Sequence, residues 1–121
     1  MIPKILFISL VLVTIVSVKA EDATTTAKEI ISEQVALLKA ADIQKFKTCF
    51  TERQKERITK ESIKKGQREI SNYTIDDLVA STVEGEYNDE KTIKIKMANG
   101  RTLTTLVFQN GKWLADTIWF R

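Results

Sequence analysis

Residues 92–120 read TIKIKMANGRTLTTLVFQNGKWLADTIWF. Three segments rich in β-forming residues, 92–97, 102–108 and 112–120, are separated by the pairs Asn99-Gly100 and Asn110-Gly111. An Asn-Gly pair between such segments is typical of a tight hairpin, because both turn residues take positive φ. The stretch therefore predicts three antiparallel strands joined by two hairpins, and the rest of the chain is expected to cover them.

Two-residue turns at both Asn-Gly pairs would set the register of these strands. The expected pairs are Ala98–Arg101, Ile95–Thr104 and Ile93–Leu106 in the first hairpin, and Phe108–Trp113, Leu106–Ala115, Thr104–Thr117 and Thr102–Trp119 in the second. Alternate side chains of a strand point to opposite faces of the sheet. The first face would carry Ile93, Ile95, Met97, Thr102, Thr104, Leu106, Phe108, Trp113, Ala115, Thr117 and Trp119. The second would carry Lys94, Lys96, Arg101, Leu103, Thr105, Val107, Leu114, Asp116, Ile118 and Phe120.

The first face is the better candidate to receive the helices, since it is apolar and aromatic at both ends. Its middle row is smaller and carries the hydroxyls of Thr104 and Thr117. A sheet lined in this way and covered by helices could leave a cavity for a small apolar ligand. The residues expected to line it are Ile95, Thr104, Thr117, Trp113, Trp119 and Tyr87. Alternatively, threonine is present as a good strand former, and helix side chains fill the space.

The residues of the second face predict a surface that contacts another molecule. A further β-rich segment over 73–83 predicts a fourth strand, joined to the others by a turn at 88–90. We favour a three-residue turn, which places Glu84 beside Lys94 and Val83 on the helix-facing side with Ile95. The apolar residues Leu103, Val107, Leu114 and Ile118 would then lie on an exposed face. Such a patch is typical of a surface that binds a partner or a second copy of the chain.

The segment before the sheet predicts helices. Thr26 and Glu29 have the spacing of a capping box, which indicates a helix over 27–40. Asp42 is expected to cap a short second helix, whose apolar face is Ile43, Phe46, Cys49 and Phe50. Thr51 and Thr59 are plausible N-caps of two more helices that meet near Ile58. Cys49 is the only cysteine, and its spacing favours a buried thiol over an intermolecular disulfide.

The N-terminus has the pattern of a secretory signal peptide. Lys4 precedes an apolar segment over 5–18, and Val18-Lys19-Ala20 offers small residues for cleavage after Ala20. The alternative is an uncleaved anchor, but the segment is shorter than the roughly 20 apolar residues of a spanning helix. We therefore expect one secreted or periplasmic domain over 21–121, with 17 basic and 16 acidic residues.

Basic residues are concentrated over 45–68, which holds nine of them against three acidic residues. This segment could bind an anionic surface through Lys60, Lys64 and Lys65. The alternative, which we favour, is a solvated helix face with ion pairs at helical spacing. No aromatic residues are interleaved for base stacking, so no nucleic-acid partner is expected.

The composition excludes much familiar chemistry. The chain has no histidine, which removes the usual general base and most zinc sites, and it has no glycine-rich phosphate loop. No metal or cofactor is expected. The one weak catalytic candidate is Asp77, which in a strand over 73–83 would point inward on the same side as Tyr73 and Tyr87. An inward carboxylate beside a tyrosine could abstract a proton, although we favour a position at the rim in water.

The order of these elements resembles the nuclear transport factor 2-like superfamily, a cone-shaped α+β fold. The residues that carry the resemblance are Leu37-Leu-Lys-Ala-Ala-Asp42, Phe46, Cys49-Phe50 and Asn110-Gly-Lys-Trp-Leu114. It implies N-terminal helices packed on a curved four-stranded antiparallel meander, and an outer sheet face used for dimers. The superfamily includes ketosteroid isomerase-like and dehydratase-like enzymes as well as binding domains. Ser81-Thr-Val-Glu-Gly85 also loosely resembles the first inhibitory loop of cystatins.

The expected function is that of an exported, non-enzymatic binding or interaction domain. It would hold a small apolar ligand in the cone, or bind a protein partner or a second copy through the outer face of the sheet. The alternative is an isomerase-like or dehydratase-like enzyme that uses Asp77.

Overall fold

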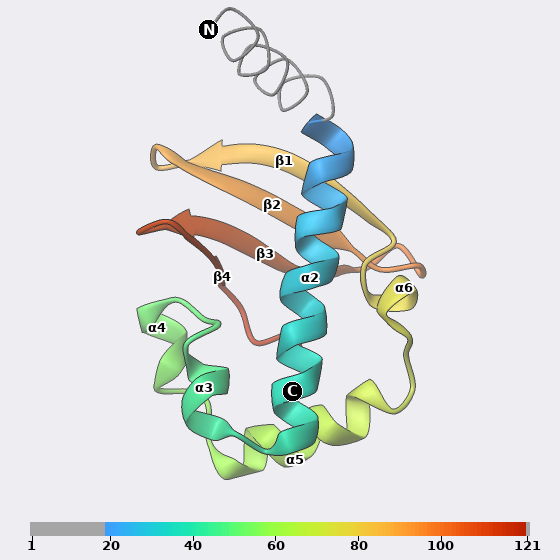
Figure 1. The fold of residues 1–121 in the computed structure, drawn as a ribbon, viewed down its shortest axis with the longest axis vertical. Coiled ribbons are helices and arrows are strands. Elements are labelled where there is room, and N and C mark those ends of the chain that lie inside the picture. The colour runs from blue at the N-terminus through green and yellow to red at the C-terminus, as the bar shows by residue number, and fades with distance from the viewer. Residues whose placement is uncertain (1–18, 121) are drawn as a thin grey trace, which may run out of the picture.

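The computed structural model describes residues 19–120, in which five helices precede a four-stranded antiparallel sheet (Figure 1). The helices are α2 (Lys19–Ala40), α3 (Ile43–Lys47), α4 (Glu52–Lys55), α5 (Lys60–Ile70) and α6 (Ile75–Leu78). The strands are β1 (Ser81–Tyr87), β2 (Glu90–Lys96), β3 (Thr102–Gln109) and β4 (Lys112–Ala115), adjacent in chain order. The α+β class and the meander are confirmed. Residues 1–18, which make up most of the predicted signal peptide, lie outside the described residues.

The centre of the sheet has the predicted register. Ile95 pairs with Thr104 and Ile93 with Leu106, while Leu106 pairs with Ala115 and Phe108 with Trp113. The second hairpin turns on Asn110 and Gly111, which both have positive φ. The pattern of β-branched residues and one Asn-Gly turn was therefore sufficient to place the middle of three strands.

The first hairpin differs from the prediction next to its turn. Its loop has three residues, 98–100, closed by a hydrogen bond from the Met97 N–H to the Arg101 carbonyl (2.8 Å). Lys96 then pairs with Thr102 while Ile95 pairs with Thr104, so Leu103 is an extra residue that forms a β-bulge. The bulge restores the central register. It also places Leu103 in the core, 7% exposed, and corrects its assignment to the exposed face.

The turn between β1 and β2 has two residues, not the three that we favoured. Asn88 and Asp89 both have positive φ, and Tyr87 pairs with Glu90. Glu84 therefore pairs with Ile93, and Val83 pairs with Lys94 on the opposite face from Ile95. Glu84 thus lies on the face that carries Ile93, where it is nevertheless exposed. β1 is an edge strand, and its residues are exposed except for the half-buried Thr82.

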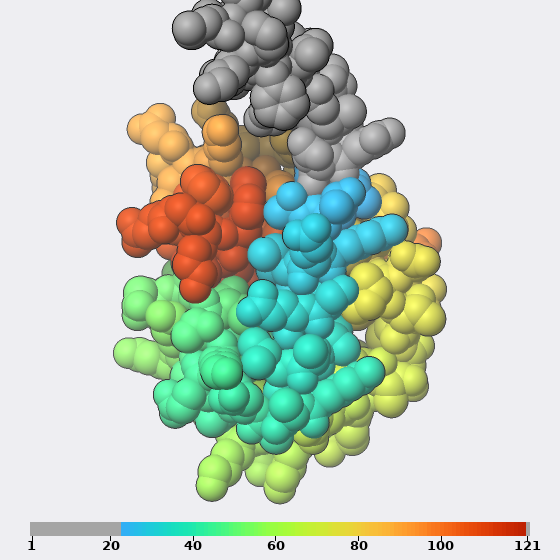
Figure 2. Space-filling model, in the orientation of Figure 1, coloured from blue at the N-terminus to red at the C-terminus, as the bar shows by residue number. Residues whose placement is uncertain are grey.

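Helix α2 packs along the face of the sheet that carries Ile93 and Ile95 (Figures 1 and 2). Its core-facing stripe is Ala23, Ala27, Ile31, Gln34 and Leu38, all at most 4% exposed. The helix begins well before the predicted capping box, so Thr26 is an interior helical residue and not an N-cap. Small alanines permit close approach to the sheet, and Thr24 and Thr82 share a hydrogen bond between hydroxyls (2.8 Å). Tertiary packing thus outweighs the poor helix propensity of three successive threonines.

The remaining helices are short, and most of their caps agree with the prediction. Asp42 caps α3, and Thr59 caps α5 in a capping box with Ser62, while Thr51 occupies the N-cap position of α4.

The predicted strand over 73–83 is wrong in its first half. Thr74 caps the one-turn helix α6 there, through a capping box with Asp77.

Asp116 joins the helices to the end of the sheet. Its carboxylate accepts hydrogen bonds from Arg53 Nε (2.9 Å) and from the Thr51 hydroxyl (2.9 Å), and its carbonyl accepts from Gln54 Nε2 (2.8 Å). The segment before α4 adds a parallel bridge to the same place, in which Phe50 pairs with Ala115. In Figure 2 the residues of α3 and α4 accordingly lie directly below the β3–β4 hairpin. Strand β4 therefore ends at Ala115, and the chain leaves β3 instead of continuing to residue 120.

The Asp116 contacts predict a pH-dependent contribution to stability. The hydrogen bond from Arg53 holds the pKa of the Asp116 carboxyl below its usual value. The carboxylate therefore stabilises the fold above the ordinary aspartate pKa of about 4, and this contribution disappears as the pH falls through the lowered pKa. We expect Asp116→Asn to lower the free energy of unfolding by about 1 kcal/mol at pH 7, and by less as the pH falls below about 4.

Urea unfolding followed by circular dichroism between pH 7 and pH 2.5 measures this difference. The matched control is Asp89→Asn in an exposed turn, where asparagine tolerates the positive φ and the expected change is below about 0.5 kcal/mol. Equal losses in the two variants, or a loss at Asp116 that does not shrink in acid, would contradict the assignment.

Candidate functional site

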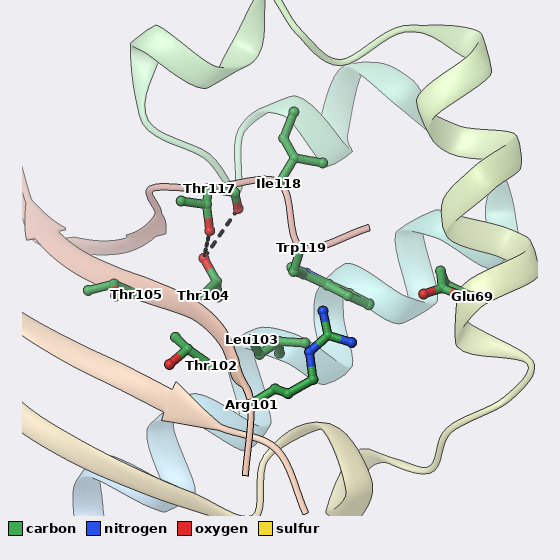
Figure 3. Close-up of a pocket in the computed structure, with 9 residues that line it drawn as sticks. All are labelled: Glu69, Arg101, Thr102, Leu103, Thr104, Thr105, Thr117, Ile118 and Trp119. Carbon is green, nitrogen blue, oxygen red and sulfur yellow. Dashed lines mark hydrogen bonds between the residues drawn. The ribbon is translucent and has the colours of Figure 1, made fainter. Parts of the chain in front are cut away.

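The strongest candidate site is a cavity of about 460 Å³ between β3, the C-terminal tail over 117–120 and α5 (Figure 3). We call it the threonine cavity. It is lined by Thr102, Thr104, Thr105 and Thr117, together with Glu69, Arg101, Leu103, Ile118 and Trp119. Its volume lies in the range of roughly 300–1,000 Å³ that is typical of small-molecule sites.

The cavity exists because the tail leaves the sheet early. A longer β4 would have paired Thr117 with Thr104 and Trp119 with Thr102, but the ladder stops at Ala115. The Thr104 hydroxyl instead contacts the Thr117 hydroxyl (2.7 Å) and carbonyl (3.2 Å), as the dashed lines of Figure 3 show. These side-chain contacts hold the tail near β3 without closing the gap, so the start of β3 forms one wall of an open space.

The lining combines hydroxyl groups, an indole ring and charges of both signs. Figure 3 shows the guanidinium group of Arg101 next to the ring of Trp119, with Glu69 on the far side. Arg101 is exposed, whereas Glu69 and Trp119 are half-buried. Leu103 and Ile118 add apolar surface. The cavity can therefore present five N–H donors, several hydroxyls and a flat apolar wall to a ligand.

A buried hydrogen bond positions the indole ring. Gln34 on α2 has no exposed surface, and its Oε1 accepts a hydrogen bond from Trp119 Nε1 (2.8 Å). The other end of the amide, Nε2, has no partner among the described residues. Phe120 then enters the core beside Phe46 and above Gly66, where it anchors the end of the tail. Gln34 and Phe120 thus set the orientation of Trp119.

Three of the six predicted ligand residues line this cavity, namely Thr104, Thr117 and Trp119. The other three lie elsewhere. Ile95 has no exposed surface and belongs to the core, so helix side chains fill the middle of the inner face around it. Trp113 packs on Phe108 at the far end of the sheet (ring centroids 5.0 Å apart), and Tyr87 is 72% exposed beside the β1–β2 turn.

The four predicted interface residues are also divided. Val107 and Leu114 lie on the face away from α2, where Val107 is buried and Leu114 half-buried, whereas Leu103 and Ile118 line the threonine cavity. Val83 and Tyr87, which are 54% and 72% exposed, belong to the same outer face as Val107.

Sequence reasoning missed Arg101 and Glu69 as lining residues. Arg101 follows the Asn-Gly pair, and only the longer loop and the bulge bring it to the cavity. Glu69 comes from α5, which is 32 positions earlier in the chain, and no periodicity links the two residues. Phe120, which was expected on the outer face of a longer strand, is a core residue 2% exposed.

Asp77 and Cys49, which the sequence analysis considered for their reactive groups, both lie in contacts that belong to the fold. The Asp77 carboxylate accepts a hydrogen bond from the Thr74 N–H (2.9 Å) within α6, so it does not extend from a strand toward Tyr87. Cys49 is buried, as predicted, and burial raises the pKa of its thiol to about 11. A protonated, buried thiol is a poor nucleophile.

Within residues 19–120, no cluster of three or more histidine, cysteine, aspartate or glutamate side chains has an arrangement that could hold a metal ion. Over the same part of the chain, no helix has the length and apolar character needed to cross a membrane.

The Gln34–Trp119 hydrogen bond predicts strong coupling between the two side chains. Trp119→Phe should destabilise the protein by about 1–3 kcal/mol, because it leaves the buried amide of Gln34 without any partner. Gln34→Leu in the Trp119→Phe background should recover about 1 kcal/mol, since it removes the unsatisfied amide. Urea unfolding of the wild type, both single variants and the double variant measures the coupling. Additive effects would show that the two side chains are energetically independent.

Comparisons of the chain with models of known protein families, with curated proteins and with solved structures found no match.

Proposed function

We propose that residues 21–121 form an exported, non-catalytic binding domain of the nuclear transport factor 2-like type. Its ligand is a small molecule with a flat apolar body and one anionic group, and it occupies the threonine cavity. The observation that carries this proposal is the lining of that cavity, in which Arg101, four threonines and Trp119 face a volume of about 460 Å³. The export of the domain rests on the N-terminal pattern of the sequence.

The anionic group is inferred from the charges at the cavity. Arg101 is an exposed, forked donor that suits a carboxylate or sulfonate. Glu69 has the opposite sign, but it directly follows a segment, 45–68, that holds nine basic and only three acidic residues. The net field of this segment favours an anion.

The apolar body is inferred from Trp119, Leu103 and Ile118. An indole ring held by Gln34 offers a pre-organised flat surface, which lowers the entropic cost of binding. The threonine hydroxyls can donate to or accept from polar atoms on the ligand. Binding fits this lining better than catalysis does, because among the described residues Glu69 and Arg101 are the only ionisable groups that line the cavity.

A matched pair of probes tests both parts of the ligand. The probes are 1-anilinonaphthalene-8-sulfonate and N-phenyl-1-naphthylamine, which share the aromatic body but differ in the sulfonate. In a Trp113→Phe background, Trp119 is the remaining tryptophan, so its quenching reports binding at this cavity. We expect both probes to quench Trp119. Arg101→Gln should weaken the sulfonate by about 5- to 10-fold and leave the neutral probe unchanged.

The control is Lys112→Gln, which removes one positive charge at an exposed position in the far hairpin. It should change neither probe. Binding that leaves Trp119 unquenched would place the ligand elsewhere. Equal sensitivity of both probes to Arg101→Gln would remove the argument for an anionic group.

A second candidate function is self-association through the outer face of the sheet. Val83 and Tyr87 are unusually exposed there, and Val107 and Leu114 belong to the same face. Apolar side chains grouped on one sheet face are typical of an interface.

Size-exclusion chromatography with light scattering tests this candidate. We expect a dimer that Leu114→Asp converts to a monomer, because a half-buried leucine on the contact face would be replaced by a charge. The control Thr25→Asp changes an exposed residue of α2, away from this face. A wild-type protein that is monomeric at millimolar concentration would exclude self-association.

A further inference from the structure

The charge of the domain is strongly segregated along the chain. Residues 45–68 hold nine basic and three acidic residues, whereas the rest of 21–121 holds eight basic and thirteen acidic residues. The basic segment forms α3, α4 and α5, which gather at one end of the long axis of the molecule (Figure 1). A nearly neutral domain therefore has a strongly positive end.

Helix α5 carries four of these nine basic residues at exposed positions, together with one exposed acidic residue, Glu61. Ile63, Gly66 and Ile70 face the core, so the opposite side is polar. We call Lys60, Lys64, Lys65 and Arg68 the basic face, and all four are exposed. Among the described residues, ion pairs involve Lys28, Arg53 and Lys55 but none of these four. The expected ion pairs at helical spacing therefore form in α4, between Glu52 and Lys55, but not on the basic face.

A second cavity adjoins the basic face. It has a volume of about 320 Å³ and lies between α4 and α5, where Arg57 and Lys65 line it together with Gln54, Thr59, Ser62, Glu61, Ile118 and Phe120. Lys65 belongs both to this cavity and to the basic face. The two cations outnumber the one carboxylate of the lining, that of Glu61, and together with the hydroxyls of Thr59 and Ser62 they can accommodate a sulfate or carboxylate and the sugar hydroxyls next to it.

The composition of α5 distinguishes between kinds of polyanion. A helix that inserts into a bilayer needs exposed apolar side chains, but those of α5 point into the core. Single-stranded nucleic acid is usually bound with aromatic stacking, and residues 51–72 contain no aromatic residue. Recognition here would depend on charge and hydroxyl hydrogen bonds alone, which suits a charged glycan.

We propose that the basic face binds a linear anionic polysaccharide, with one of its anionic groups seated between Arg57 and Lys65. This surface is separate from the threonine cavity, and the proposal does not depend on the small ligand. The polysaccharide lies along the outward side of α5, where consecutive anionic groups meet consecutive cations.

The test measures the affinity of the full domain for a heparin oligosaccharide by isothermal titration calorimetry at 50 and 300 mM NaCl. Binding should weaken at least 10-fold at the higher salt concentration, because exposed charges are screened. Lys60→Gln/Lys64→Gln/Lys65→Gln should weaken binding at 50 mM by 10-fold or more. The control Lys91→Gln/Lys94→Gln/Lys112→Gln removes the same charge from exposed positions in the sheet and should change the affinity less than 3-fold.

A second pair of variants tests whether an anionic group of the polysaccharide binds in the cavity between α4 and α5. Arg57→Gln should weaken heparin binding by 3-fold or more, whereas Arg101→Gln, at the other cavity, should have no effect. Equal losses from the two triple variants would reduce the effect to net charge and overturn the proposal, as would the absence of heparin binding at 50 mM NaCl.

Two further probes test the assigned class of partner. Duplex DNA and vesicles containing phosphatidylserine carry anionic groups without the hydroxyls of a sugar chain. Each should bind at least 5-fold more weakly than heparin. Equal or tighter binding of either probe would overturn the assignment to a polysaccharide.

Discussion

The contact between Asp116 and the start of α4 determines how the two halves of the domain fit together. The Asp116 side chain accepts from Thr51 and Arg53, and its carbonyl accepts from Gln54, so three residues at the start of α4 meet one residue at the end of the sheet. Hydrogen bonds to a charged acceptor are stronger than neutral ones. They favour an arrangement in which the chain turns toward the helices after Asp116, whose N–H still donates to the Thr105 carbonyl of β3 (2.9 Å). The position of the tail, and therefore the threonine cavity, depends on this turn.

The tail has its own constraints once it has left the sheet. Phe120 is buried against Phe46, and a side chain larger than hydrogen at Gly66 would meet Leu38 Cδ2 at 2.8 Å and Phe120 Cε1 at 3.0 Å. Gly66 is therefore needed for the close approach of α5 to the tail, despite the low helix propensity of glycine. Trp119 is held from the other side by Gln34 of α2. Two helices that are distant in sequence thus fix four consecutive residues that have no regular secondary structure.

Local signals predicted the parts of the fold that depend on local physics. The Asn110-Gly111 turn, the central strand pairs and the caps Asp42 and Thr59 follow from the preferences of a few adjacent residues. The wrong predictions concern element boundaries and turn lengths that depend on contacts between residues distant in sequence. The start of α2 depends on Ala23 and Ala27 packing against the sheet. The bulge at Leu103 depends on the burial of this apolar side chain in the core. The two-residue turn at Asn88 depends on the exposure of β1 at the edge of the sheet. Half of the predicted ligand residues line the threonine cavity, because Thr104 and Thr117 meet through their side chains although the ladder expected to join them does not form.

The two cavities share one wall, and this follows from the same turn at Asp116. Ile118 lines the threonine cavity on one side and the cationic cavity between α4 and α5 on the other. Contacts with Thr104, Gln34 and Phe46 hold the residues on either side of Ile118. A tail that paired fully with β3 would fill the first cavity with Thr117 and Trp119 and withdraw Ile118 from the second. The early end of β4 is therefore the feature that leaves two cavities at the periphery of a fold whose central inner face is filled by side chains.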